Sequence, residues 1–149
     1  MHDSSPIEVV CGLIFHGGRV LACRRDPGRS FPLMWEFPGG KRQDGENPET
    51  ALHRELEEEL RLRIRILRAL DPVAYNGGGH DILLIPFVCQ PDQEEAPTPL
   101  DHIEIRWVPV NRANRLTWAP ADIPLVESLS RHEALRLPGN AEKNLGQGR

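Results

Sequence analysis

The sequence predicts a single α/β (α+β) domain built around a mixed β-sheet. Short segments rich in Val, Ile and Leu recur along most of the chain, as expected of strands. One amphipathic segment interrupts them near the middle, and a second follows the last of them. Strands that surround one helix and precede another pack with both helices as a layered sandwich. At 149 residues, the chain has the size of one domain with a substantial core.

The first third of the chain is expected to form a β-hairpin, a loop and a short extended piece. Gly17 and Gly18 make a tight turn between two segments rich in branched apolar residues. Prolines and glycines then mark a loop, and an extended piece leads from it into a second glycine pair. The expected strands are residues 7–15, 19–24 and 35–37, with the loop at 26–34.

The middle of the chain predicts further strands. Arginine and aliphatic residues alternate strictly over residues 61–66, which predicts a half-buried strand that continues to Tyr75 with a break near Asp71. Pro86 indicates that its own strand lies at an edge of the sheet or contains a bulge. The other expected elements are a hairpin turn at 76–79, strands at 81–89 and 104–110, a loop at 90–101 and a turn or short helical piece at 110–113.

A second helix is expected to begin at residues 120–122 and to end by Leu137, ahead of a Pro-Gly pair. Its buried positions are Leu125, Val126 and Leu129. The polar residues that follow have nothing to bury and are expected to be disordered. The expected organisation is a flexible N-terminus at 1–5, one domain at 6–137 and a tail at 138–149.

The composition is ordinary for a soluble globular protein, with 39% hydrophobic and 27% charged residues. The formal net charge of −4 argues against general binding to the backbone of a nucleic-acid polymer. No apolar run has membrane-spanning length, and the first residues lack the features of a signal peptide. We therefore expect a cytoplasmic protein, monomeric or homodimeric, with no membrane partner.

The three cysteines, Cys11, Cys23 and Cys89, lie in apolar, strand-like stretches. Their number is odd, and no pair has the spacing of metal ligands. Buried thiols in a reducing compartment are the expected state.

The helix near the middle of the chain carries the candidate chemistry. Asn47 is a good N-cap, and Pro48 suits the first helical position. Glu55, Glu58 and Glu59 stand at i, i+3 and i+4 and so share one face, beside the face that three leucines bury. Crowded carboxylates raise one another's pKa unless a cation lies among them, and Mg²⁺ or Mn²⁺ suits such oxygen ligands. The plainer alternative is a solvated acidic face with an Arg54–Glu58 ion pair.

This segment resembles the motif of the Nudix family, G-x5-E-x7-R-E-U-x-E-E-x-G-U, in which U is a bulky aliphatic residue. The matching positions are Gly40, Glu46, Arg54, Glu55, Leu56, Glu58, Glu59 and Leu62. Arg61 replaces the last glycine, which would serve as a left-handed helix C-cap. An arginine in that conformation costs on the order of 1 kcal/mol, unless the helix ends differently.

The resemblance implies an αβα sandwich around a mixed sheet over about residues 6–136, and a pyrophosphate-hydrolysing enzyme that uses Mg²⁺ or Mn²⁺. It implies that Glu55, Glu58, Glu59 and the carbonyl of Gly39 bind metal. Arg54 would orient a glutamate or contact a phosphate. Glu46 is expected to be auxiliary.

A further acidic residue is expected from outside the motif. Residues 101–107 resemble a family segment, E-x-x-E followed by an aliphatic residue, Arg and Trp. Glu104 is the first choice as the additional metal ligand or base, and Asp101 the second. The alternative is that Glu104 is a strand-face glutamate with no role.

Three segments resemble the MutT-like branch of the family, which cleaves nucleoside triphosphates to the monophosphate and pyrophosphate: residues 24–25, 35–41 and 116–124. The last resembles the A-P-A-D-I-P segment of CTP and modified-pyrimidine pyrophosphohydrolases. Asp122 would accept hydrogen bonds from a base edge, or cap the last helix, or both. The other substrate-binding candidates are Arg25, Phe37, Gly39, Gly40 and Lys41, with Trp35 expected in the core.

The alternatives are stacking or core packing for Phe37, and a phosphate or ribose contact or a solvated strand end for Arg25. The favoured function is a Mg²⁺-dependent (d)NTP pyrophosphohydrolase, which removes 8-oxo-dGTP or acts on CTP or modified dCTP. An ADP-ribose or dinucleoside polyphosphate hydrolase is the second hypothesis. The third is a non-catalytic nucleotide-binding module, which the complete set of motif carboxylates disfavours.

Overall fold

The computed structural model describes residues 5–77, 79–92 and 96–131. The strands are β1 (Ile7–His16), β2 (Arg19–Arg24), β3 (Trp35–Glu36), β4 (Gly39–Lys41), β5 (Ile64–Ala69), β6 (Val73–Gly77), β7 (His80–Pro91) and β8 (Glu104–Pro109). The helices are α1 (Pro48–Leu60) and α2 (Ile123–Arg131), with 3-10 helices η1 (Val110–Arg115) and η2 (Pro120–Asp122). Three expectations lie outside the described residues: the flexible N-terminus apart from Ser5, the end of the last helix by Leu137, and the tail at 138–149.

The sheet is mixed, as expected. β1 runs parallel to β7 and antiparallel to β2 and β4. β7 pairs antiparallel with β5 and β6, and β2 pairs antiparallel with β3 and β8. β1 therefore lies at the centre, and β4 brings the glycine pair directly against it.

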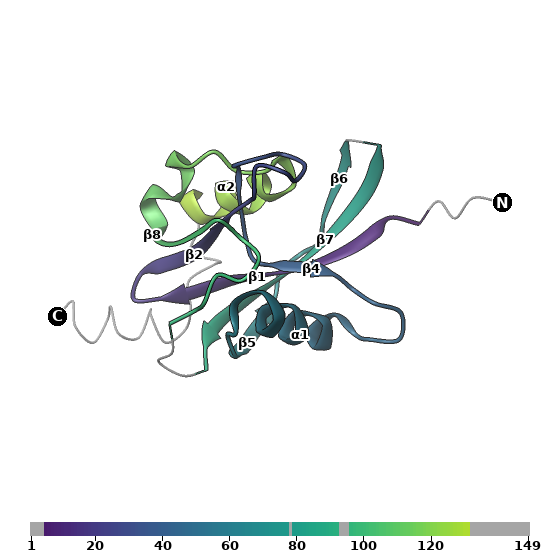
Figure 1. Cartoon of the computed structure of the whole chain (residues 1–149), viewed down its shortest axis with the longest axis horizontal. Helices are drawn as coiled ribbons and strands as arrows, with labels where there is room; N and C mark the ends of the chain where they lie inside the picture. Colours follow the sequence, from purple (N-terminus) through teal and green to yellow (C-terminus); the bar gives the residue numbers. More distant parts are fainter. Residues whose placement is uncertain (1–4, 78, 93–95, 132–149) are drawn as a thin grey trace.

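The two helices cover opposite faces of this sheet (Figure 1). Even-numbered residues of β1, Val10 and Ile14, pack with the leucines of α1. Odd-numbered residues of the same strand, such as Leu13, pack with α2. A strand with both faces buried has apolar side chains at successive positions, which explains the nearly continuous apolar run of β1. The expected αβα sandwich is confirmed.

Helix α1 ends through a left-handed residue, and β5 consequently starts later than the alternation of arginines predicted. Arg61 has φ 50° and ψ 39°. Its N–H donates to the carbonyl of Glu57, the single 5→1 bond of the αL capping motif, and the N–H of Leu62 donates to the carbonyl of Leu56. The chain thus tolerates an arginine where a glycine is usual, and the strand begins only at Ile64.

The expectation of an edge strand or bulge at Pro86 is wrong. β7 is internal, with β1 on one side and β5 and β6 on the other. Pro86 falls opposite the gap between β5 and β6, where its carbonyl accepts from the N–H of Leu70. In a strand, the N–H and C=O of a residue point the same way, so the missing N–H faces that gap and breaks no pairing.

Within the described residues, no helix is long and apolar enough to span a membrane. Cys11, Cys23 and Cys89 are free and buried, as expected.

Candidate active site

The start of α1 fixes the position of the carboxylate face. The side chain of Asn47 accepts from the N–H of Thr50 at 2.8 Å, and Pro48 occupies the first turn. Leu52, Leu56 and Leu60 are fully buried against the sheet. The helix therefore cannot rotate without exposing these leucines, and its glutamates are held at the border of the core.

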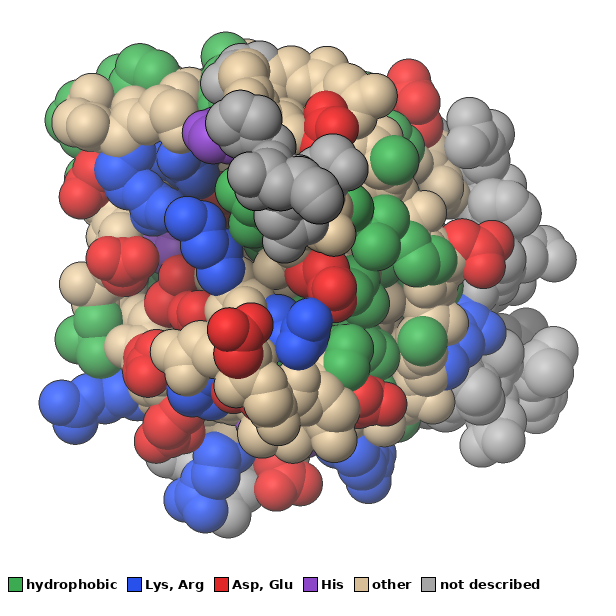
Figure 2. Space-filling view, turned by 90° about the vertical axis from the view of Figure 1, so that its right-hand side faces the viewer, with side chains coloured by type: hydrophobic (Ala, Val, Ile, Leu, Met, Phe, Trp, Pro, Cys, Tyr) green, Lys and Arg blue, Asp and Glu red, His purple; other side chains and the backbone are tan. Residues whose placement is uncertain are grey.

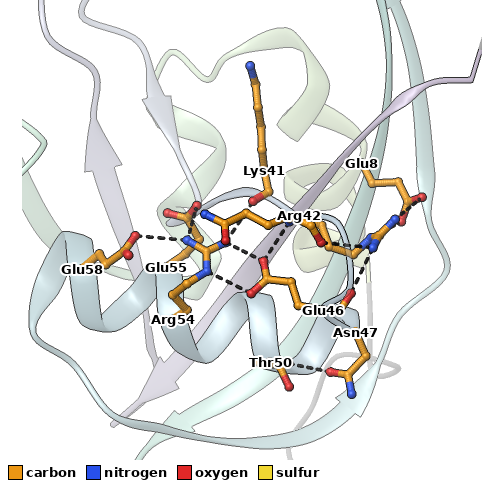
Figure 3. Close-up of polar contacts among 10 residues, drawn as sticks. Glu8, Lys41, Arg42, Glu46, Asn47, Thr50, Arg54, Glu55 and Glu58 are labelled. Atoms are coloured by element: carbon orange, nitrogen blue, oxygen red, sulfur yellow. Dashed lines mark hydrogen bonds and ion pairs between the residues drawn. The ribbon is translucent and has the colours of Figure 1, made fainter. Parts of the chain in front are cut away.

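Arg54 gathers the acidic side chains of the motif (Figure 3). It binds Glu46 through two nitrogens, at 3.0 and 2.6 Å, and the carbonyl of Lys41 at 3.1 Å. Its remaining terminal nitrogen, Nη1, lies 3.3 Å from Glu55 and 3.1 Å from Glu58. The two-nitrogen contact lowers the pKa of Glu46 to about 2, with help from the N–H of Gln43. Arg54 thus joins the helix to the segment that follows β4, and Glu46 mainly orients Arg54.

The three candidate metal ligands on α1 differ in their surroundings. Glu58 is largely exposed, whereas Glu55 and Glu59 line a pocket. Glu59 is buried and accepts from the N–H of Gly39 at 3.3 Å. Burial raises the pKa of Glu59 to about 8, reinforced by the charges of Glu55, Glu36 and Asp101. Burial also raises the pKa of Glu55. Glu59 thus lies where negative charge exceeds positive charge.

Gly39 and Gly40 are required because other atoms lie too close to admit a β-carbon at either position. A β-carbon on Gly40 would lie 2.4 Å from the carboxyl group of Glu55. A β-carbon on Gly39 would collide with the backbone of Val10 in β1. The two glycines therefore let β4 lie between the central strand and the carboxylates of α1.

The pocket has a volume of about 680 Å³. Its lining includes the glycine pair, Lys41, Glu55 and Glu59. It also includes Asp122 of η2, Phe37 and residues of the loop after β2. The volume suits a ligand of nucleotide size.

Asp122 and Phe37 both line this pocket, as the base-binding prediction requires. The Phe37 ring packs against Trp118, with centroids 4.6 Å apart. Asp122 is buried, and its carboxyl group accepts from the N–H of Phe37. Burial raises the pKa of Asp122 well above its usual value, and the charge of Glu36 adds to this effect. Trp35 lies in the core, as expected.

Arg25, a candidate for phosphate or ribose contact, is engaged within the protein. Its guanidinium donates to the Ser30 carbonyl at 2.6 Å, to the Ser30 hydroxyl at 2.9 Å and to Glu36 at 2.7 Å. Arg25 thus holds the loop after β2 to β3. Lys41, by contrast, has an exposed side chain at the pocket rim, where it can meet a ligand.

Sequence reasoning missed Glu36 and His102 as members of the site. Glu36 lines the pocket and bonds to Arg25 on one oxygen and to Nε2 of His102 on the other, at 2.8 Å. Both residues lie within segments that resemble family segments, residues 35–41 and 101–107. Their pairing depends on strand register and loop packing, which no local pattern specifies.

Glu104, the first choice for an additional metal ligand, is not brought to the pocket. It bonds to Arg106 at 2.7 Å and to Arg24 at 3.4 Å. Its neighbour Ile105 packs with the core on the α1 face, so by strand alternation Glu104 points to the opposite face. Asp101, the second choice, lies nearer, since its charge acts on Glu59 and it contacts Arg29 at 3.6 Å.

The donor set suits a hard divalent cation in its chemistry. It consists of three carboxylates on one helix face beside a glycine pair that leaves room for them. Within the described part of the chain, no three acidic, His or Cys side chains converge closely enough to hold a metal ion as they stand. Arg54 at present spans Glu55 and Glu58, so a cation bound between them would replace part of that bonding.

The NUDIX domain family model matches residues 6–129. The chain belongs to the Nudix family. It is a Nudix hydrolase, and enzymes of this family act on nucleotide substrates and use divalent metal ions.

Two curated relatives are similar over most of their length. The CTP pyrophosphohydrolase of Escherichia coli (strain K12) is 32% identical over 87% of this chain and 96% of its own. A putative 8-oxo-dGTP diphosphatase 2 of Mycobacterium tuberculosis (strain H37Rv) is 33% identical over 83% and 87%. The relatives thus include enzymes named for a pyrimidine and for an oxidised purine triphosphate.

Solved structures show the same fold. The solution structure of the E. coli ORF135 protein superposes with a TM-score of 0.74 and 29% identity, covering 89% of this chain and 94% of its own. The MutT protein of methicillin-resistant Staphylococcus aureus 252 gives a TM-score of 0.70 and 34% identity, covering 86% and 98%. The MutT-like character expected from the sequence is confirmed.

Proposed function

We propose that this protein is a Mg²⁺-dependent nucleoside triphosphate pyrophosphohydrolase that forms a nucleoside monophosphate and pyrophosphate. The carrying observation is that one pocket is lined both by Glu55 and Glu59 and by Phe37 and Asp122. A nucleotide bound there can place its polyphosphate beside the two glutamates and its base beside Phe37 and Asp122. The relatives named as triphosphate hydrolases support the same assignment.

The residues divide the work as follows. Glu55, Glu58, Glu59 and the carbonyl of Gly39 would hold the metal, and Arg54, held by its two-nitrogen contact with Glu46, would orient the glutamates beside it. Mg²⁺ supplies charge neutralisation of the polyphosphate and activation of a water. Lys41 at the rim would bind a phosphate, and Phe37 would form one wall of the base site.

The metal also explains the charge imbalance around Glu59. A buried carboxyl group near three other acids takes up a proton unless a cation offsets their charge. Mn²⁺ fits the same oxygen ligands. Asp101 is better placed than Glu104 for an auxiliary role, because its charge reaches Glu59.

A substrate panel tests this function. Canonical, oxidised and methylated triphosphates are incubated with Mg²⁺ or with a chelator, and nucleotide products and pyrophosphate are measured. We expect at least one triphosphate to yield the monophosphate and pyrophosphate only with metal. Turnover of ADP-ribose or dinucleoside polyphosphates alone would support the alternative hydrolase activity instead.

A further inference from the structure

Two acidic side chains besides the motif glutamates line the pocket. They are Glu36 and Asp122, and the charge of Glu36 acts on Asp122 and on Glu59. Glu36 directly precedes Phe37, the proposed wall of the base site, which favours a position beside the nucleoside. An ionised carboxylate only accepts hydrogen bonds and therefore selects ligand groups that donate them.

Glu36 is held ionised by its partners. Burial alone would raise its pKa, but the hydrogen bonds and charges of His102 and Arg25 together outweigh burial and leave the pKa below its usual value. Arg25 takes Oε1 at 2.7 Å and His102 takes Oε2 at 2.8 Å. Each oxygen thus keeps a lone pair for a ligand.

His102 acts from behind this carboxylate. Its side chain is completely buried and does not line the pocket. Because the ionised Glu36 can only accept, Nε2 must carry the proton of their bond. Among the described residues, the buried Nδ1 has no hydrogen-bond partner, so the bond of Nε2 to Glu36 is what orients the ring.

Backbone hydrogen bonds attach the segment around His102 to both α1 and β2. The N–H groups of Thr98 and Leu100 donate to the carbonyls of Leu60 and Glu59, at 2.7 and 3.0 Å. These carbonyls belong to the last turn of α1, which lacks helical partners for them. The N–H of Ile103 donates to the carbonyl of Arg24 at the end of β2. His102 is thus fixed relative to both the carboxylate helix and the sheet.

We propose that His102 is a positioning residue that holds Glu36 ionised and oriented, so that Glu36 reads a nucleobase through an exocyclic amine or an adjacent ring N–H. The substrate class is a nucleotide with a donor edge, as in cytosine and guanine. This inference rests on the proposed function for its substrate, while the arrangement of the carboxylate stands on the geometry alone.

The test compares His102→Leu, which removes the donor, with His102→Gln, whose amide can place a donor near the position of Nε2. His80→Leu, at an exposed histidine of β7, is the matched control. Kinetics are measured for CTP against UTP and for GTP against ITP, because UTP and ITP lack the exocyclic amine. Calorimetry with CMP, UMP, GMP and IMP measures binding without turnover, and thermal melting reports folding.

In His102→Leu we expect the preference for the amine-bearing base to fall about tenfold or more, through KM and monophosphate affinity, with kcat nearly unchanged. His102→Gln should restore the preference, and His80→Leu should keep it. In a double-mutant cycle, Glu36→Gln should remove the preference and leave no further effect for His102→Leu.

Three results would overturn the proposal: an unchanged preference in His102→Leu, an equal loss for all bases that Gln does not restore, or additive effects in the cycle. Failure of the proposed function is distinguishable. Absence of triphosphate turnover, with a monophosphate preference that depends on His102, would remove the function and support the positioning role.

Discussion

At the scale of single residues, Gly39 and Gly40 have different tasks although they are neighbours. A β-carbon on Gly40 meets the end of a flexible side chain, that of Glu55, whereas one on Gly39 meets the backbone of the central strand. A side chain can move aside, but the strand cannot. Gly40 therefore leaves space for the Glu55 carboxyl group, whereas Gly39 lets β4 pack against the central strand.

Alanine substitutions separate these tasks. Gly40→Ala should displace Glu55 and lower kcat by about 100-fold or more, since displaced catalytic groups have effects of this size, while the melting temperature changes little. Gly39→Ala should destabilise the protein by about 1–3 kcal/mol through overpacking. Activity assays and urea denaturation of both variants measure this. The reverse pattern, a stable inactive Gly39→Ala with a normal Gly40→Ala, would contradict the assignment.

Asp122 predicts a pH dependence of stability. Its pKa is raised in the folded protein, chiefly by burial and then by Glu36, so folding favours its protonated form. This contribution is complete below the pKa of the unfolded chain, near 3.8, and is lost as the pH rises through the folded pKa. Asp122→Asn removes this pH-dependent contribution, because the asparagine side chain does not titrate in this pH range.

The stability of Asp122→Asn relative to the natural protein should therefore increase between pH 5 and pH 8. Thermal melting of both proteins across this range, without metal, measures the difference. Arg25 keeps its contact with Glu36 in both proteins, so their common pH dependence cancels. A constant difference, or one that shrinks toward pH 8, would show that Asp122 is ionised in the folded protein.

At the scale of elements, α1 was predictable almost in full. Asn47, Pro48 and the leucine spacing are local signals, and the structure confirms each of them. The start of β5 was not predictable from the alternation of arginines, because Arg61 and Leu62 are used to end the helix. The internal position of Pro86 was not predictable for a related reason, because the gap that accommodates it lies between β5 and β6.

The end of α1 makes a prediction about Arg61. Replacing Arg61 with Gly removes the cost of the left-handed conformation and should stabilise the protein by up to about 1 kcal/mol. Arg61→Ala is the control, because it removes the same charge but keeps the β-carbon. Urea denaturation compares the three proteins. If Arg61→Ala raises the stability as much as Arg61→Gly does, the gain comes from removal of the charge and not from the backbone conformation.

At the scale of the whole molecule, the site is assembled from opposite sides of the sheet. α1 supplies the carboxylates on one side, and η2, at the start of α2, supplies Asp122 from the other. Basic and acidic side chains interleave over the face shown in Figure 2, in keeping with the small net charge. Attraction of a polyphosphate therefore depends on local ligands and metal, and not on a broad basic surface.

This assembly also sets what sequence could predict of the site. The carboxylates of α1 form one contiguous motif, so the fold class and hydrolase activity followed from it. The Glu36–His102 pair joins residues far apart in the chain, and so does the pairing of Glu104 with Arg24 across strands. Contacts of this kind depend on register, which a single sequence does not specify.

Glu58→Gln tests whether metal-dependent hydrolysis relies on the carboxylates of α1. Glu58 is exposed and its substitution leaves the core intact, so thermal melting should remain close to that of the natural protein. With Mg²⁺ and the best triphosphate of the panel, we expect kcat for pyrophosphate release to fall by about three orders of magnitude. An unchanged kcat in a folded Glu58→Gln protein would show that the carboxylate of Glu58 has no part in the hydrolysis.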